Sequence, residues 1–390
     1  MNVLFATTDY IKKGKPTTGF PTYLYRVSQA LLKLGHTPII LVIGTNDSYK
    51  VNDGVEIYTV QISETCVNNN CVKYLCDSIK KSWVINKKIK EIIRRRKIDI
   101  IQFTSLNGIA LFYRENIPAV LRLSSYAKTS FQTYGTYNKH FVHLMALIEI
   151  VSSRRCNAIF APCQLTANYF RKDSHRKVYV IESPFVNDVE QEDKEIYEKA
   201  LSNKKYFLFF GSLYIEKGIM VIGEILERLL EQYSDYYFVF VGKNMVINGE
   251  PASMILKRKA GRYQNRIIIL DAMPHERLYP IIQNADLVIL PSLMDNFPNA
   301  CVEAMYFSKI VIGTDGASFE QLITDKENGL LCRPGDSMDL YSKIEYAMNL
   351  SEVQKRQMEE KAHRRIYYLK PEIVVRKLVN FYKKVIDCVK

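Results

Sequence analysis

The chain has 390 residues, more than one ordinary hydrophobic core holds, and its length suits two domains. With 47% hydrophobic and 24% charged residues, it has the composition of a globular protein and not of a disordered one. The net charge of +13 is unusual and is compatible with nucleic acid, an anionic membrane surface or a phosphorylated substrate as partner. No apolar run reaches the ~18 residues that a membrane-spanning helix needs.

The amino terminus and the cysteines point to a cytoplasmic protein without metal. The start, MNVLFATTDYIKKGK, places apolar residues before charged ones, which is the reverse of a signal peptide. Eight cysteines in a chain of this length do not make a disulfide framework. Cys66, Cys71 and Cys76 recur every five residues, but zinc sites usually have closer cysteine pairs or nearby histidines.

Apolar clusters alternate with helical patterns along the first half, which is a β/α layout. Several clusters are continuous apolar runs, as expected for parallel strands covered on both faces. A first helix is predicted over Thr22–Leu34, because Gly35 tolerates the positive φ of a helix C-cap. The strands predicted here are Val3–Thr7, Ile39–Ile43, Ile98–Thr104, Ala119–Leu123, Ala158–Pro162 and Val178–Ile181.

A strongly polar segment, NDVEQEDKEIYEKALSNKK at residues 187–205, is predicted to be a linker. The strands predicted after it are Tyr206–Phe210, Phe238–Val241, Ile267–Leu270, Leu287–Pro291 and Ile310–Gly313. We therefore predict Rossmann-like domains at residues 1–186 and 206–370 and a final helix at residues 371–390. Two doubly wound sheets in tandem predict a ligand cleft that faces the carboxyl ends of their strands.

The common nucleotide-binding motifs are absent from the sequence. There is no GxxxxGK[ST], and no GxGxxG follows the first strand. The segment FFGSLYIEKG instead places Lys217 between a predicted strand and a helix, where a lysine can meet phosphate oxygens as a point charge. The alternative is an exposed lysine in an ordinary strand-to-helix loop.

The segment PSLMDNFPNACVEAM, residues 291–305, joins a predicted strand to a helix that begins near Asn299. The first backbone N–H groups of such a helix bind anions well. Asp295 in the loop and Glu303 in the helix are placed to reach two parts of one elongated ligand. The alternative is structural, with Asp295 or Asn296 capping the helix and Glu303 compensating its dipole.

These motifs, in this order, resemble the retaining GT-B glycosyltransferases of family 4. Asp295 and Glu303, with seven residues between them, resemble the EX7E signature of that family. FGSLYIEKG resembles its GR-L-x-x-x-KG segment, and ADLVILPS resembles the strand that leads into the signature. DKENGLLCRPGD resembles its NGLL-x-x-PGD stretch, and GFPTYLYRVSQALLKLGH resembles the first-domain glycine loop, its helix and the closing GH.

The resemblance implies an α/β protein of the GT-B fold, with two Rossmann-like doubly wound domains facing a central cleft. The C-terminal helix is expected to cross back to the first, acceptor-side domain. The implied activity is metal-independent, retaining transfer of a hexose-type sugar from a nucleoside diphosphate sugar to a glycan, lipid-linked or other acceptor. Bacterial surface polysaccharide or glycoconjugate synthesis is the implied setting. No cofactor is implied, and the donor is UDP or GDP type.

The resemblance also assigns residues. Lys217 neutralises the donor diphosphate, Glu303 holds the ribose hydroxyls and Asp295 holds a hydroxyl of the transferred sugar. The other donor-binding residues implied are Gly19, Gly211, Ser212, Met273, Phe297, Pro298, Asn299 and Ala300.

Several positions depart from the family pattern. Ser212 stands where an arginine usually accompanies the lysine, and Asp295 is one methylene shorter than the usual glutamate. The first-domain loop reads Gly19-Phe20-Pro21 in place of a glycine pair, and Ser124 and Ser125 stand where a histidine is common.

Two other functions fit parts of the sequence. A nucleotide-sugar epimerase or hydrolase of the same fold explains the donor site but fewer of the motifs. A basic nucleic-acid-binding protein would explain the charge and the 26 tyrosines. However, 41 acidic residues are interspersed with the basic ones, and no nucleic-acid-binding motif is present.

Residues 80–97, KKSWVINKKIKEIIRRRK, hold nine basic residues against one acidic residue, Glu91. Apolar residues at near-helical spacing accompany them, namely Trp83, Ile85, Ile89, Ile92 and Ile93. The pattern predicts a helix that lies on an anionic membrane at its inner face. The alternative is a packed surface helix whose isoleucines face the sheet of the first domain.

Overall fold

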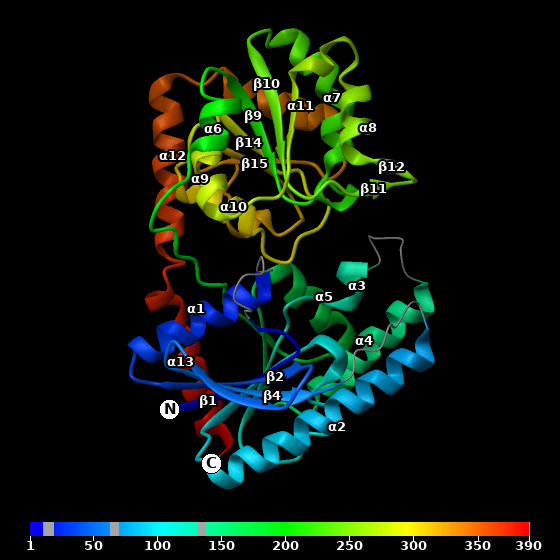
Figure 1. Cartoon of the computed structure of the whole chain (residues 1–390), viewed down its shortest axis with the longest axis vertical. Coiled ribbons are helices and arrows are strands. Elements are labelled where there is room, and N and C mark those ends of the chain that lie inside the picture. Colours follow the sequence, from blue (N-terminus) through cyan, green and yellow to red (C-terminus); the bar gives the residue numbers. More distant parts are fainter. Residues whose placement is uncertain (11–18, 63–69, 132–137, 390) are drawn as a thin grey trace. The chain divides into compact units, whose positions relative to one another are not determined.

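The apolar runs form two mainly parallel sheets in the computed structural model, one in each of two units (Figure 1). The structure describes residues 1–10, 19–62, 70–131 and 138–389. Unit 1 comprises Met1–Val186 and Leu369–Lys390, and unit 2 comprises Asn187–Tyr368. Each unit is a separate Rossmann-like fold.

The sheet of unit 1 has the strand order β3-β4-β2-β1-β5-β6-β7-β8. All neighbours are parallel except the edge pair β3 and β4, and Val3 of β1 pairs with both Pro38 and Ile100. The strands are β1 (Asn2–Thr7), β2 (Thr37–Gly44), β3 (Ser48–Asn52), β4 (Val55–Gln61), β5 (Ile100–Thr104), β6 (Ala119–Arg122), β7 (Ala158–Ala161) and β8 (Val178–Val180). Strands therefore occur at all six positions predicted in this half, and only the β3–β4 hairpin is missing from the prediction.

Helices cover both faces of this sheet (Figure 1). They are α1 (Gly19–Lys33), α2 (Cys71–Arg95), α3 (Ala127–Phe131), α4 (Lys139–Ser153), α5 (Gln164–Ser174) and α13 (Pro371–Val389), with a short 3-10 turn η1 (Leu106–Gly108). Val3 and Phe5 of β1 pack on the face that carries α1 and α13, and Leu4 and Ala6 pack on the face of α2, α4 and α5. Since side chains alternate along a strand, a continuous apolar run is what a sheet covered on both faces requires.

The C-terminal helix α13 returns to unit 1, as the resemblance implies. Val375, Leu378 and Tyr382 are buried against α1 and the sheet. The Tyr382 hydroxyl donates a hydrogen bond to Oε1 of Gln102 on β5 at 2.5 Å.

The structure of α2 contradicts the prediction that its isoleucines face lipid. Ile85, Ile89 and Ile92 are buried in the core between α2 and the sheet, and Ile93 packs against the same core. The alternative of a packed surface helix is therefore confirmed for the isoleucines, and of the predicted apolar set only Trp83 is exposed. No described helix is both long and apolar enough to cross a bilayer.

The sheet of unit 2 is parallel throughout, with the order β13-β10-β9-β14-β15-β16. The strands are β9 (Lys205–Phe210), β10 (Tyr236–Val241), β13 (Ile267–Leu270), β14 (Leu287–Ile289), β15 (Val311–Thr314) and β16 (Leu330–Cys332), and a separate hairpin holds β11 (Val246–Ile247) and β12 (Glu250–Pro251). In chain order the sheet reads 3-2-1-4-5-6, so the direction of winding reverses between β9 and β14. Ligands of doubly wound folds bind at this switch point.

The helices of unit 2 are α6 (Glu195–Ala200), α7 (Ile219–Gln232), α8 (Ala252–Lys259), α9 (His275–Gln283), α10 (Asn299–Tyr306), α11 (Ser337–Met348) and α12 (Glu352–Tyr367), with 3-10 turns η2 (Ile215–Lys217), η3 (Gly261–Arg266) and η4 (Phe319–Gln321). The polar segment predicted as a linker belongs to this unit. It contains α6, which packs on α9, and Nε of Arg277 donates to Oδ2 of Asp193 at 2.7 Å.

Candidate functional site

The loops that follow β9 and β14 meet at the switch point of unit 2. The two strands are parallel neighbours, so their carboxyl ends lie at the same edge of the sheet. The backbone N–H of Leu293, in the loop after β14, donates to the carbonyl of Glu216 in η2 at 2.8 Å. This hydrogen bond joins the two segments that the sequence singles out.

Gly218 allows these two loops to pack closely against each other. Its φ is 76°, in the left-handed region, and a Cβ there would lie 1.9 Å from the carbonyl oxygen of Pro291. Only glycine allows the backbone after η2 to pass this close to the end of β14. Lys217, the residue before it, is thereby held at the edge of the sheet.

Lys217 forms an ion pair with Asp295. The distance from Nζ to Oδ2 is 2.6 Å, and 35% of the lysine side chain and 18% of the aspartate side chain are exposed. Lys217 is thus partly exposed and ion-paired. The pair brings together two of the three residues predicted to be catalytic, although 78 residues separate them in the chain.

Asp295 does not cap α10. The N-cap position is Pro298, whose side chain forms no capping hydrogen bond. The first intrahelical bond runs from Val302 N–H to the Pro298 carbonyl, so the N–H groups of Asn299, Ala300 and Cys301 precede the hydrogen-bonded ladder. The carbonyl of Asp295 accepts from the Ser318 hydroxyl at 2.8 Å, which holds the loop against the segment after β15.

Glu303 lies one turn into α10 and faces the first residue of α9. Its Oε1 is 3.5 Å from Nε2 of His275, and 12% of the Glu303 side chain is exposed. The His275 ring stacks on Tyr279, with ring centroids 5.1 Å apart and an interplanar angle of 17°. Glu303 thus lies beside the start of α9, and the sequence analysis does not include His275 among the site residues.

Gly211 leaves open space at the end of β9. Its φ is 135°, and a Cβ there would meet no atom within 4 Å. Gly242, at the end of the neighbouring β10, has a φ of 150°, and its Cβ would lie 1.8 Å from the Gly211 carbonyl oxygen. Two strand ends without side chains lie side by side, a surface that a ligand can approach closely.

The other predicted donor-binding residues lie around this edge, except one. Ser212 and Asn299 are exposed, and Phe297 and Pro298 are buried. The remaining members are the partly exposed Met273 and Ala300 of unit 2 and Gly19, which begins α1 in unit 1.

Two family descriptions match most of the chain. Residues 190–365 match Glycosyl transferases group 1, and residues 17–185 match Glycosyltransferase Family 4. The chain belongs to the GT-B glycosyltransferases of family 4. Among solved structures, a sucrose-phosphate synthase from Thermosynechococcus elongatus covers 100% of both chains, with a TM-score of 0.78 at 14% identity. Such a likeness supports the GT-B fold.

Curated relatives of this glycosyltransferase match it over only part of either chain. An alpha-D-kanosaminyltransferase from Streptomyces kanamyceticus is 24% identical over 57% of this chain and 56% of its own. A 2-deoxystreptamine N-acetyl-D-glucosaminyltransferase from Niallia circulans is 25% identical over 42% of this chain and 39% of its own. The chain therefore spans about half, or less, of the length of these relatives.

Two further carboxylates lie near the candidate site, and no motif in the sequence points to them. Glu216 precedes Lys217 and is buried, and its Oε2 has no hydrogen-bond partner among the described residues. Burial raises the pKa of the Glu216 carboxyl above its ordinary value. Asp315 follows β15 at the same edge of the sheet. Neither residue stands out in the motifs, whereas His275 has one signal, its position at the start of a helix after a strand.

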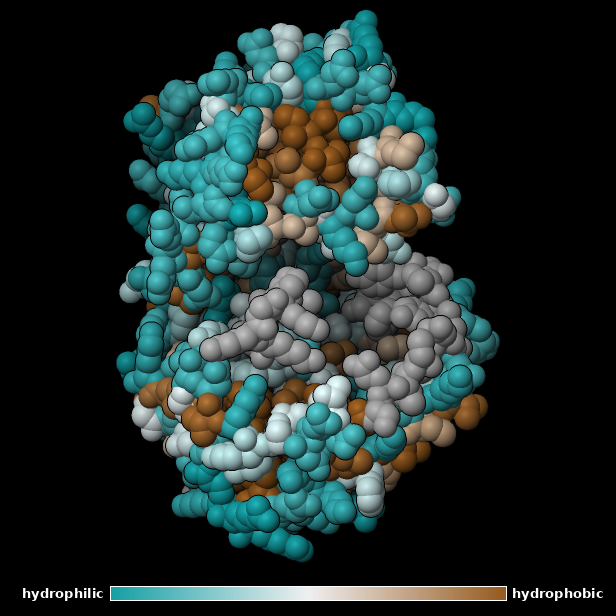
Figure 2. All heavy atoms as spheres, in the orientation of Figure 1, coloured by the Kyte–Doolittle hydropathy of each residue, from teal (hydrophilic) through white to brown (hydrophobic). Residues whose placement is uncertain are grey.

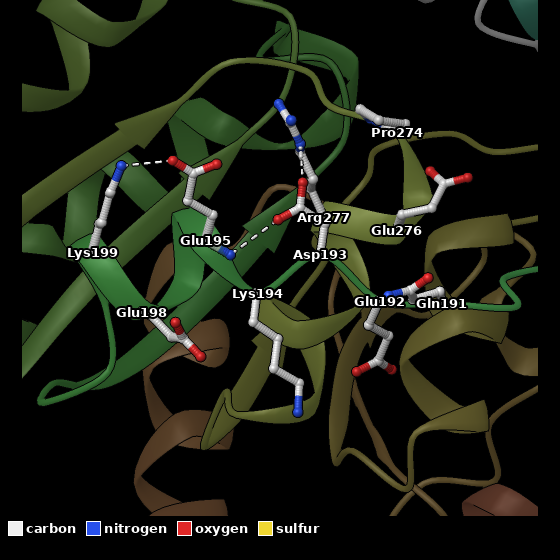
Figure 3. Close-up of a pocket in the computed structure, with 10 residues that line it drawn as sticks. All are labelled: Gln191, Glu192, Asp193, Lys194, Glu195, Glu198, Lys199, Pro274, Glu276 and Arg277. Atoms are coloured by element: carbon white, nitrogen blue, oxygen red, sulfur yellow. Dashed lines mark hydrogen bonds and ion pairs between the residues drawn. The ribbon is translucent and has the colours of Figure 1, made fainter.

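A pocket of unit 2, of about 1030 Å³, is lined by none of the predicted site residues and lies between the segment around α6 and the start of α9 (Figure 3). Five acidic and three basic side chains line it, and two of its ion pairs join Arg277 to Asp193 and Lys199 to Glu195. No cluster of three or more histidine, cysteine, aspartate or glutamate residues suited to a metal occurs in the described parts of the chain. Cys66 of the predicted cysteine series lies outside the described residues.

Proposed function

We propose that the protein is a retaining hexosyltransferase, which moves a hexose-type sugar from a nucleoside diphosphate sugar to a glycan, lipid-linked or other acceptor. One observation carries the proposal. Lys217 and Asp295 pair at the switch point of a Rossmann sheet, and α10, with Glu303 one turn in, begins four residues after Asp295. A cation and a helix N-terminus suit a diphosphate, and carboxylates suit the hydroxyls of the sugars on either side of it.

The proposed step is substitution at the anomeric carbon. The bond from that carbon to the diphosphate oxygen breaks, and its electron pair passes to the diphosphate. The acceptor oxygen bonds to the same face of the sugar and loses its proton to the departing phosphate. The transition state resembles an oxocarbenium ion, and negative charge grows on the diphosphate.

Lys217 and the free N–H groups of α10 stabilise that charge, in the manner of an oxyanion hole. They supply positive charge without a divalent metal, so we propose a metal-independent reaction. Lys217 is paired with Asp295. We infer that the diphosphate, which carries more charge than one carboxylate, draws Nζ toward itself and frees Asp295 for a sugar hydroxyl.

Glu303 is proposed to hold the ribose hydroxyls, with His275 orienting its carboxylate from 3.5 Å away. Gly211 and Ser212, Met273, and residues 297–300 of unit 2 complete the proposed donor site. The names of two relatives, a kanosaminyltransferase and an N-acetyl-D-glucosaminyltransferase, support a hexose-derived sugar. The proposal includes bacterial surface polysaccharide or glycoconjugate synthesis, at the inner face of an anionic membrane.

The stereochemistry of the product tests this proposal. The α-configured donor that is turned over, identified from a panel, is reacted with its acceptor, and the anomeric coupling of the product is read by proton NMR. An α-linked product supports retention. A β-linked product, or activity that disappears in a chelator and returns with a divalent metal, contradicts the proposal.

A further inference from the structure

Helix α2 presents a second apolar stripe, on the side opposite its buried isoleucines. Val72, Leu75, Ile79 and Trp83 are spaced by three, four and four residues, so they lie on one face over about three turns. Their exposed fractions are 71%, 39%, 40% and 59%. Figure 2 shows hydrophobic side chains at the surface along the amino-terminal half of α2, at the lower right.

The same face becomes basic toward the end of the helix. Lys87, Lys90 and Arg94 continue the spacing after Trp83, and Nζ of Lys87 lies 5.6 Å from the centre of the Trp83 ring. Lys80 flanks the stripe. The ion pairs among the described residues of α2 involve Lys81, Lys88 and Lys90, and none involves Lys80, Lys87 or Arg94.

Three other basic residues of this segment are instead paired. Lys81 bonds Asp77 at 2.5 Å, Lys88 bonds Glu91 at 2.9 Å, and Arg96 bonds Glu56. On the outer face, as far as the structure describes the chain, the one cation with an acidic partner is Lys90, 3.4 Å from Glu115. Unpaired cations thus gather on the face that also carries the exposed apolar side chains.

We propose that this outer face of α2 docks the protein on an anionic lipid surface. Apolar side chains and the tryptophan ring enter the boundary between headgroups and acyl chains, and lysine stems extend along it with their charges toward phosphate. A second copy of the chain suits the face poorly. A parallel α2 pair would set cations against cations, and an antiparallel pair would cover apolar residues with unpaired cations.

The proposal rests on the peripheral membrane contact included in the proposed function and gives that contact a surface. It does not depend on which sugar is transferred. Vesicles of phosphatidylcholine alone test the affinity that comes from apolar contact. Vesicles of phosphatidylcholine with phosphatidylglycerol add the affinity that comes from electrostatic attraction. The anionic vesicles are expected to bind the protein at low salt, and high salt is expected to weaken that binding.

Trp83 is the one tryptophan of the chain, so its fluorescence reports directly on the proposed face. On anionic vesicles, its emission is expected to shift to shorter wavelength and to become protected from acrylamide. Binding of the protein to vesicles with an unchanged Trp83 emission overturns the proposal, because another surface then makes the contact.

A matched pair of variants completes the test. Val72→Ser/Lys87→Gln/Arg94→Gln removes one exposed apolar residue and two unpaired cations from the face. Val353→Ser/Arg356→Gln/Lys361→Gln makes the same changes on the exposed side of α12. The affinity of the first variant for anionic vesicles is expected to fall at least roughly tenfold, and the affinity of the second is expected to equal that of the wild type. Equal losses in both variants, or no loss in the first, overturn the proposal.

Donor hydrolysis in solution distinguishes this proposal from the proposed reaction. Both variants are expected to hydrolyse the donor at the wild-type rate without vesicles, since neither changes the switch point of unit 2. A wild type that binds vesicles but releases no nucleoside diphosphate contradicts the reaction and leaves the docking face supported.

Discussion

Lys217 and Asp295 illustrate how a modest interaction in the folded protein can matter for chemistry. Their charged atoms lie 2.6 Å apart, but a third of the lysine side chain is exposed to water. Solvent screening limits the contribution of such a pair to stability to at most about 1 kcal/mol. At a departing diphosphate the same cation meets charge that grows in the transition state, where one electrostatic contact is worth several times more.

We therefore predict that Lys217→Ala lowers kcat/KM and so raises the activation free energy by about 2–4 kcal/mol. The midpoint of denaturant unfolding is expected to shift little, because the lost ion pair is partly exposed. Steady-state kinetics and a denaturant titration measure the two effects separately. Turnover within a factor of about three of wild type would remove Lys217 from the mechanism.

Replacing each of the two carboxylates is predicted to have a different effect. Glu303→Gln should weaken binding of the free nucleoside diphosphate by about 1–3 kcal/mol, because a charged hydrogen-bond acceptor to the ribose is lost. Asp295→Asn should leave that affinity nearly unchanged and lower sugar transfer. Calorimetric titration with the nucleoside diphosphate checks both. Equal nucleotide affinity in wild type and Glu303→Gln contradicts the ribose assignment.

At the scale of elements, the joint between η2 and α7 depends on one glycine. Gly218→Ala should destabilise unit 2 by more than the ~1 kcal/mol of a left-handed alanine, because the new Cβ overlaps the Pro291 carbonyl. Gly316→Ala is the matched control, since Gly316 has a φ of 75° and its Cβ would meet nothing within 4 Å. Equal losses of unfolding free energy in the two variants would show that the close approach is unimportant.

The burial of Glu149 on α4 predicts that the stability of the protein depends on pH. Glu149 is buried beneath α3, accepts the Ala127 N–H at 3.2 Å, and has its pKa raised to about 8 by burial. Between pH 4.5 and 8 the folded state then binds more protons than the unfolded one, so stability falls as the pH rises, by up to ~1.4 kcal/mol per pH unit. Glu149→Gln should flatten that slope in denaturant titrations from pH 5 to 8. An unchanged slope contradicts the assignment to Glu149.

The sequence predicts those elements whose apolar residues are continuous or periodic. The buried strands around Val3 and Phe207 are of this kind. The β3–β4 hairpin is missed because its edge strand β3 is largely exposed and polar, although Asp53-Gly54 at its turn is a known hairpin signal. In the site, local motifs identify Lys217 and Glu303. The partners of these residues come from distant segments, so only the fold reveals the pairings with Asp295 and His275.

For the molecule as a whole, cations serve two separate proposed purposes in two places. One is the edge of unit 2, where Lys217 and the start of α10 suit a diphosphate. The other is the outer face of α2 in unit 1, where unpaired cations continue an exposed apolar stripe. Neither place has the features of a nucleic-acid-binding surface, such as a known motif with stacked aromatic residues along a basic groove.

We propose that the edge of unit 2 between β9 and β14 activates a nucleoside diphosphate sugar. The most direct test incubates the wild type and Lys217→Ala with a panel of such sugars, without acceptor, and measures release of the nucleoside diphosphate by chromatography. The wild type is predicted to release it from at least one hexose donor, and Lys217→Ala to do so at least about 30-fold more slowly. Release by both proteins at the same rate, or no release above buffer from any donor, would contradict the claim.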